Sequence, residues 1–101
     1  MIVHQVLCPK KNRLIRVAGS KRQRLVEVGD LVSTVPFSWT SMMSVTKFKI
    51  INRRKFVQVS TLIAWSRDLE SKGLKKDAAQ LEEFIEWVSN VEFLMKDKAH
   101  V

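Results

Sequence analysis

Residues 46–69 read TKFKIINRRKFVQVSTLIAWSRDL, and the pattern that decides the fold changes within them. At the start, apolar or β-branched side chains alternate with lysines: Thr46, Phe48 and Ile50 against Lys47 and Lys49. A period of two buries one face of a strand and leaves the other face in water. The stretch therefore begins as a β-strand that is expected to bury Ile50 and to expose its lysines.

The period changes from two to a helical spacing near Ser60. A polar turn is predicted at residues 52–55, followed by a short strand at residues 56–59. Ser60 or Thr61 can then cap a helix, because a hydroxyl accepts a hydrogen bond from a free N–H group of the first turn. The apolar residues that follow are spaced by three or four: Leu62, Trp65 and Leu69. Gly73 is placed to end this helix, since glycine readily adopts the left-handed conformation of a C-terminal cap.

The residues before this stretch have the composition of a β-meander. Short β-prone runs alternate with segments rich in glycine, proline, asparagine and basic residues. The runs are residues 3–7, 13–18, 25–28 and 31–35. Gly29 and Asp30 are predicted to form the turn between the last two runs. Residues 37–44 then form a loop that carries large apolar side chains.

A second, longer helix is predicted from about Lys75 to Lys96. One apolar stripe follows the spacing of three or four residues: Ala78, Leu81, Phe84, Ile85, Val88, Val91 and Met95. Four acidic residues lie largely outside this stripe: Glu82, Glu83, Glu86 and Glu92. Trp65 and Trp87, one on each helix, are interpreted as core residues.

Together these patterns predict an α+β fold. Residues 1–59 form a small antiparallel β-sheet or a partly open OB-like barrel, and residues 60–97 form a C-terminal helical hairpin. At 101 residues the chain is the size of one domain, and neither half alone can bury much apolar surface. Residues 1–101 are therefore expected to form a single domain with one shared core.

The composition is that of a globular, intracellular protein. Hydrophobic residues make up 46% of the chain and charged residues 28%, close to the average for soluble domains. No apolar run approaches the roughly 18–20 residues that cross a bilayer, so no membrane partner is expected. The start of the chain lacks the basic lead and cleavage site of a signal peptide. Cys8 is the only cysteine, which suits the reducing cytoplasm and provides neither a disulfide nor a zinc site.

The net charge of +8 is unevenly distributed. Residues 1–55 hold twelve Lys and Arg residues against only Glu27 and Asp30, a charge of +10. Residues 56–101 hold six basic and eight acidic residues, a charge of −2. Such a split favours a polyanionic partner for the first half, nucleic acid above all. The alternative is that these residues are ordinary solvated side chains of hairpins.

The basic residues gather in three predicted turns. In a meander alternate turns emerge at the same end, so some of the clusters are expected to converge and to neutralise phosphates. The candidate nucleic-acid-binding residues are Lys10, Lys11, Arg13, Arg16, Lys21, Arg22, Arg24, Lys47, Lys49, Arg53, Arg54 and Lys55. Phe37 and Trp39 are candidates for base stacking, although covering the open end of a barrel is the favoured interpretation of both.

No arrangement of residues points to catalysis, so the protein is not expected to be an enzyme. His4 and His100 lie near opposite ends of the chain, and Cys8 has no orienting histidine and acid in an evident pattern. Each glycine has a turn or cap explanation, and no glycine-rich phosphate loop is present. No catalytic residue, cofactor, metal or small-molecule substrate is therefore assigned.

Residues 14–32, LIRVAGSKRQRLVEVGDLV, resemble a stretch of the OB-fold translation initiation factor one-A family. The shared features are a strand, a glycine followed by a basic run, another strand, and a Gly-Asp turn that leads into a strand. Residues 48–51, 63–65 and 72–73 are also similar to that family's last barrel strand and following helix. Ribosomal proteins with a β-barrel share this order of strands, basic runs and Gly-Asp turns. The resemblance implies an RNA-binding barrel face that carries Lys21, Arg22 and Arg24.

Three functional classes remain open at this stage. The leading hypothesis is a non-enzymatic nucleic-acid-binding protein, with RNA slightly ahead of DNA. The second is a small protein-interaction module or inhibitor that docks on a larger machine. The third is a structural subunit of a ribonucleoprotein or virion, which would have the same basic composition.

Overall fold

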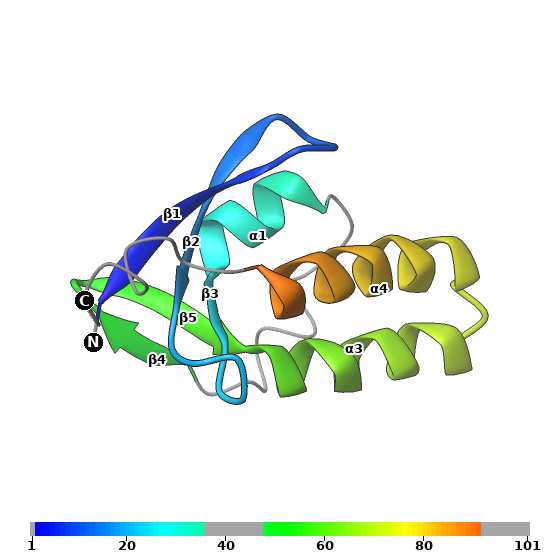
Figure 1. The fold of residues 1–101 in the computed structure, drawn as a ribbon. Coiled ribbons are helices and arrows are strands. Elements are labelled where there is room, and N and C mark those ends of the chain that lie inside the picture. The colour runs from blue at the N-terminus through cyan, green and yellow to red at the C-terminus, as the bar shows by residue number, and fades with distance from the viewer. Residues whose placement is uncertain (1, 36–47, 92–101) are drawn as a thin grey trace.

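A five-stranded antiparallel sheet is covered on one face by helices in the computed structural model, which describes residues 2–35 and 48–91 (Figure 1). The strands are β1 (Val3–Cys8), β2 (Arg13–Ala18), β3 (Leu25–Glu27), β4 (Lys49–Ile51) and β5 (Arg54–Gln58). The helices are α1 (Val28–Thr34), α3 (Val59–Ser71) and α4 (Lys75–Asn90). The strand order is β1-β2-β3-β5-β4, so β1 and β4 form the two edges of an open sheet. The predicted α+β class is confirmed, and the sheet is open.

Two hairpins form the sides of the sheet, and each turns on an asparagine with positive φ. In the first hairpin Cys8 pairs with Arg13, and Asn12 has a φ of 51°. In the second hairpin Ile51 pairs with Arg54, which leaves only Asn52 and Arg53 in the turn. Their φ values of 51° and 66° match a two-residue turn with positive φ at both positions. The turn predicted at residues 52–55 is therefore too long, because Arg54 and Lys55 belong to β5.

The alternation predicted for the fourth strand is shifted by one residue. Ile50 is 61% exposed, whereas Ile51 is 8% exposed and packs in a small cluster with Phe56. A shift of one residue turns every side chain of a strand to the opposite face. Here the pairing of Ile51 with Arg54, next to the buried Phe56, selects the face that Ile51 occupies.

The segment predicted to be a Gly-Asp turn and an extended run is helix α1. Glu27 precedes the helix, and its side chain accepts a hydrogen bond from the N–H of Asp30 at 2.6 Å. Val28, Leu31 and Val35 lie at helical spacing and are buried in the main core. Packing of this apolar face against the core overrides the β propensity of the valines and threonine in the segment.

Helices α3 and α4 form the predicted hairpin, with different caps from those expected. α3 begins at Val59 after Gln58, which makes no side-chain capping bond, so neither Ser60 nor Thr61 is the cap. Its end agrees with the prediction for Gly73, which has a φ of 83° and donates its N–H to the carbonyl of Glu70. Leu74 donates to the carbonyl of Leu69, which completes a Schellman motif.

One core joins the sheet to the three helices of the described residues. It contains Ile15, Val17, Val26 and Val57 from the sheet, Leu31 from α1, Leu62 and Trp65 from α3, and Leu81, Phe84, Ile85 and Val88 from α4. The predicted stripe of α4 is confirmed over the described helix, and Glu82, Glu83 and Glu86 are exposed. None of the described helices is long and apolar enough to cross a membrane.

Some sequence predictions fall in segments 36–47 and 92–101, outside the described residues. They concern Phe37, Trp39 and Lys47 in the first segment, and Glu92, Met95 and Lys96 of the predicted second helix in the other. Within the described residues α4 ends at Asn90, and Val91 has an extended backbone, so the prediction that Val91 continues the helix is wrong.

The shared core predicts that the sheet and the helices unfold together. Phe84 is 5% exposed, and replacing a buried phenylalanine by alanine costs about 3–5 kcal/mol. We expect Phe84→Ala to lower the free energy of unfolding by that amount in one transition, followed in urea by circular dichroism and tryptophan fluorescence. The exposed Glu86→Ala should change it by no more than about 0.5 kcal/mol. Recovery of a cooperatively folded sheet after deletion of residues 74–101 would show that the core is not shared.

Candidate nucleic-acid interface

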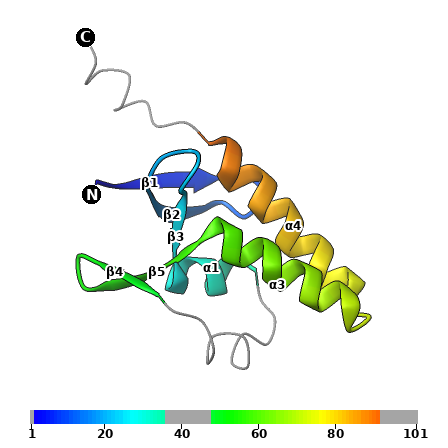
Figure 2. The ribbon, with the colours of Figure 1, turned by 90° about the horizontal axis from the view of Figure 1, so that it is seen from below.

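The basic residues of the first half lie on three separate connections of the sheet. The antiparallel register places the β1–β2 and β4–β5 turns at one end and the β2–β3 loop at the other. The twist of the sheet separates the two turns at the shared end, since their tips point in different directions (Figures 1 and 2). The predicted clusters are therefore three distinct sites and do not merge into one.

The β1–β2 turn carries Lys10, Lys11 and Arg13, and it is tied to α4. Lys10 forms an ion pair and a hydrogen bond with Glu83, although both side chains are largely exposed. The hydrogen bond raises the pKa of Lys10 and lowers the pKa of Glu83. The charge of Lys10 is thus partly compensated, while Lys11 and Arg13 are exposed.

Arg16 is held by Asp30 of α1. The N–H of Arg16 donates to Oδ2 of Asp30 at 2.9 Å, and its Nη1 lies 3.1 Å from both carboxylate oxygens. The side chains are 30% and 18% exposed, respectively. A partly buried charged pair with these hydrogen bonds holds α1 against β2. The role of Arg16 is therefore structural, and its side chain is less available to a ligand.

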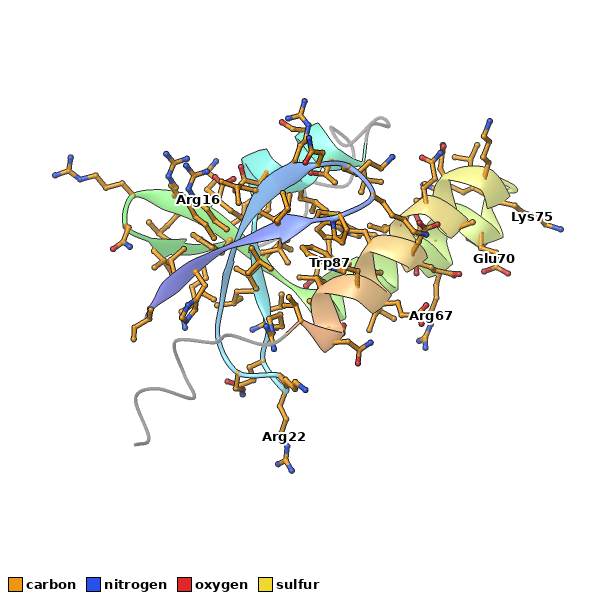
Figure 3. All side chains as sticks on the ribbon, turned by 45° about the horizontal axis from the view of Figure 1, so that its top comes forward. Arg16, Arg22, Arg67, Glu70, Lys75 and Trp87 are labelled. Atoms are coloured by element: carbon orange, nitrogen blue, oxygen red, sulfur yellow. The ribbon has the colours of Figure 1, made fainter. Side chains whose placement is uncertain are left out.

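The β2–β3 loop presents two of its three basic residues. Lys21 and Arg22 are exposed, and Arg22 points away from the body of the protein (Figure 3). Arg24 is only 3% exposed, and burial lowers its pKa. The guanidinium of Arg24 therefore adds nothing to the basic surface that was predicted to include it.

The β4–β5 hairpin carries the densest positive charge of the described residues. Lys49, Arg53, Arg54 and Lys55 are all exposed, and residues 48–58 contain no acidic residue. Nη1 of Arg54 lies 3.7 Å from Oε2 of the buried Glu27. Nζ of Lys55 lies 5.6 Å from the centre of the Phe48 ring, a cation–π distance.

Both acidic residues of the first half are used inside the fold. Glu27 is 6% exposed and caps α1, and Gly29 allows this because a Cβ there would lie 3.0 Å from Oε1 of Glu27. Asp30 is turned towards Arg16. Among the described residues 2–35 and 48–55, every fully exposed charged side chain is therefore positive, because Glu27 is buried and Asp30 is only 18% exposed and paired with Arg16.

Aromatic side chains offer no open stacking surface among the described residues. Phe56, Phe84 and Trp65 are buried, and Phe48 and Trp87 are partly buried against the main core. The ring centres of Phe84 and Trp87 are 5.7 Å apart. Within the same residues no group of three histidine, cysteine or acidic side chains could hold a metal ion.

A pocket of about 510 Å³ lies between the β1–β2 turn, the end of α1 and α4. Its walls include Cys8, Val35, Phe84 and Trp87, with Lys10, Lys11, Glu83 and Glu86 among the polar residues. The volume is that of a small-ligand site. Its two lysines face two glutamates, so the pocket has no net attraction for phosphate.

No protein-family model, no curated protein and no solved structure matches this chain. The use of the basic surface must therefore be inferred from its own residues.

The clamp between Asp30 and Arg16 is testable by stability. In Asp30→Ala the N–H of Arg16 loses its acceptor, and an unsatisfied, partly buried donor costs about 1–3 kcal/mol. We expect the free energy of unfolding to fall by that amount in urea titrations. Asp68 forms an exposed ion pair with Lys72 on α3, and Asp68→Ala should cost no more than about 0.5 kcal/mol. Equal effects of the two variants would contradict a structural role for Asp30.

Proposed function

We propose that this chain is a non-enzymatic nucleic-acid-binding protein that contacts phosphates through the basic connections of its sheet. The observation that supports the proposal is the internal use of Glu27 and Asp30, which removes negative charge from the surface of the basic half. Lysine and arginine side chains that neutralise phosphates release counterions, which supplies most sequence-independent affinity. A cytoplasmic location belongs to the same proposal, because a lone cysteine suits a reducing compartment.

The exposed cations are spread over the sheet end of the molecule. They are Lys11, Arg13, Lys21, Arg22, Lys49, Arg53, Arg54 and Lys55. The helical hairpin, in contrast, mixes both signs, with Glu70 near Arg67 and Lys75 at its far end (Figure 3). A polyanion is therefore attracted to the sheet and not to the helices.

A protein-interaction module is the second candidate, and one feature of β1 favours it. Leu7 and Leu14 pair across β1 and β2, and they are 52% and 56% exposed. β1 is an edge strand without a charged or proline residue inside it, and such edges can pair with a strand of another chain. A ribonucleoprotein or virion subunit could combine this edge with the basic surface.

Charge reversal at the turns tests the nucleic-acid proposal. One exposed residue is changed in each connection: Lys11→Glu, Arg22→Glu and Arg53→Glu. Binding of generic RNA and DNA, measured by fluorescence polarisation at roughly 50 and 200 mM salt, should be lost or fall by about tenfold or more. The wild type should show a log–log salt slope of about −0.7 per phosphate contact on single strands.

A matched control reverses the same number of charges on the helices: Arg67→Glu, Lys75→Glu and Lys76→Glu. It changes the net charge equally but leaves the sheet surface intact, so binding should be largely retained. Circular dichroism checks the fold of both variants. Equal losses would mean that only net charge matters, and no binding by the wild type would refute the proposal in favour of protein docking.

A further inference from the structure

The β4–β5 hairpin is a narrow two-stranded ribbon that extends away from the body of the protein. Figure 2 shows it on the side opposite the far ends of α3 and α4. β4 pairs only with β5, so its outer edge is an edge of the sheet. Ile51 and Phe56 anchor the base of the ribbon in a small cluster with Ala18 and Leu25.

The cations of this ribbon lie on both of its faces and at its tip. Residues paired across an antiparallel ladder point to the same face. The pairing of Ile51 with Arg54 and of Lys49 with Phe56 puts Lys49 and Arg54 on one face. The pairing of Ile50 with Lys55 puts Lys55 on the other face, while Arg53 occupies the turn.

This arrangement suits a duplex better than a single strand. Proteins that hold single strands combine a basic groove with open aromatic rings on which bases stack. The ribbon has the positive charge but no open aromatic ring. Phe48 lies under Lys55, and Phe56 is buried in the core. Charges on two opposite faces instead match two phosphate backbones, one on each side of the ribbon.

The shape of the ribbon also separates DNA from RNA. The major groove of B-form DNA, about 12 Å wide, admits a two-stranded β-ribbon. The major groove of A-form RNA is deep and too narrow for side chains to read. The ribbon therefore favours DNA, whereas the resemblance of residues 14–32 favours RNA.

Ile50 adds an apolar contact of the kind that this groove offers. It is 61% exposed on the same face as Lys55, and no packing in the described residues accounts for it. Thymine presents its methyl group in the major groove, where apolar side chains can touch it.

We infer that the β4–β5 hairpin inserts into the major groove of B-form duplex DNA. Lys49 and Arg54 face one phosphate backbone, Lys55 faces the other, and Arg53 reaches towards the floor of the groove. The inference rests on the proposed nucleic-acid-binding function and assigns its partner and its contact element.

The test compares duplex DNA, duplex RNA and single-stranded DNA of the same sequence by fluorescence polarisation. We expect duplex DNA to bind about tenfold or more tightly than the other two at equal salt. The hairpin variant carries Lys49→Ala, Arg53→Ala and Lys55→Ala and leaves Arg54 beside Glu27. On duplex DNA it should lose about tenfold or more in affinity, with a salt slope smaller by about 2–3. Methylation of guanine N7, in the major groove, should interfere with binding, whereas methylation of adenine N3, in the minor groove, should not.

A matched control removes three charges from the other connections: Lys11→Ala, Arg13→Ala and Arg22→Ala. Its loss on duplex DNA should be clearly smaller than that of the hairpin variant, with circular dichroism as the check on folding. Equal losses, or interference by adenine N3 methylation alone, would overturn the hairpin or the groove assignment. Preference for RNA or single strands would overturn the inference and leave the proposed function standing. Failure to bind any of the three probes would refute the proposed function itself.

Discussion

The carboxylate of Asp30 accepts a backbone hydrogen bond that the short strand β3 does not satisfy, and the arrangement of the β-rich half depends on this bond. β3 has only three residues, so β2 loses its neighbour on that side at Arg16. The chain turns into α1 at this point. Asp30 accepts a hydrogen bond from the backbone N–H of Arg16, which a longer β3 would have paired. Because a buried or half-buried N–H needs an acceptor, this side chain allows β3 to end early without leaving an unpaired donor in β2.

The same arrangement determines the sign of the charge on the surface of the β-rich half. Glu27 caps α1 and lies 3.7 Å from Arg54, and Asp30 is paired with Arg16. The fold thus uses the two carboxylates of residues 1–55 as internal acceptors, while most lysines and arginines of the described connections stay exposed. Folding therefore leaves the exposed cations of the sheet without interspersed carboxylates from the same half of the chain.

Much of the fold could be predicted from local sequence patterns. The wrong predictions concern segments whose structure is determined by contacts with residues distant in the sequence. The hairpin turns, the Schellman end of α3 and the stripe of α4 depend on neighbours in sequence. The helical state of Val28–Thr34 depends on burial against strands β2, β3 and β5, and the side that Ile51 faces depends on its pairing beside Phe56. Two consecutive isoleucines satisfy a period of two in either phase, so the sequence could not select between Ile50 and Ile51.

The candidate site was predictable in composition but not in its partners. The basic residues were identified by type alone, while Glu83 meets Lys10 across 73 positions of the chain. The burial of Arg24 had no local signal, since it sits in a run that reads as a solvated loop. The stretch that resembles the initiation factor one-A family ends in α1 where that family's pattern has a strand.

Arg53, at the tip of the β4–β5 hairpin, has a left-handed backbone conformation. A residue with a Cβ in that conformation costs about 1–2 kcal/mol relative to a relaxed one, which glycine avoids. Glycine at this position would remove that cost, but it would also remove one positive charge from the tip of the hairpin.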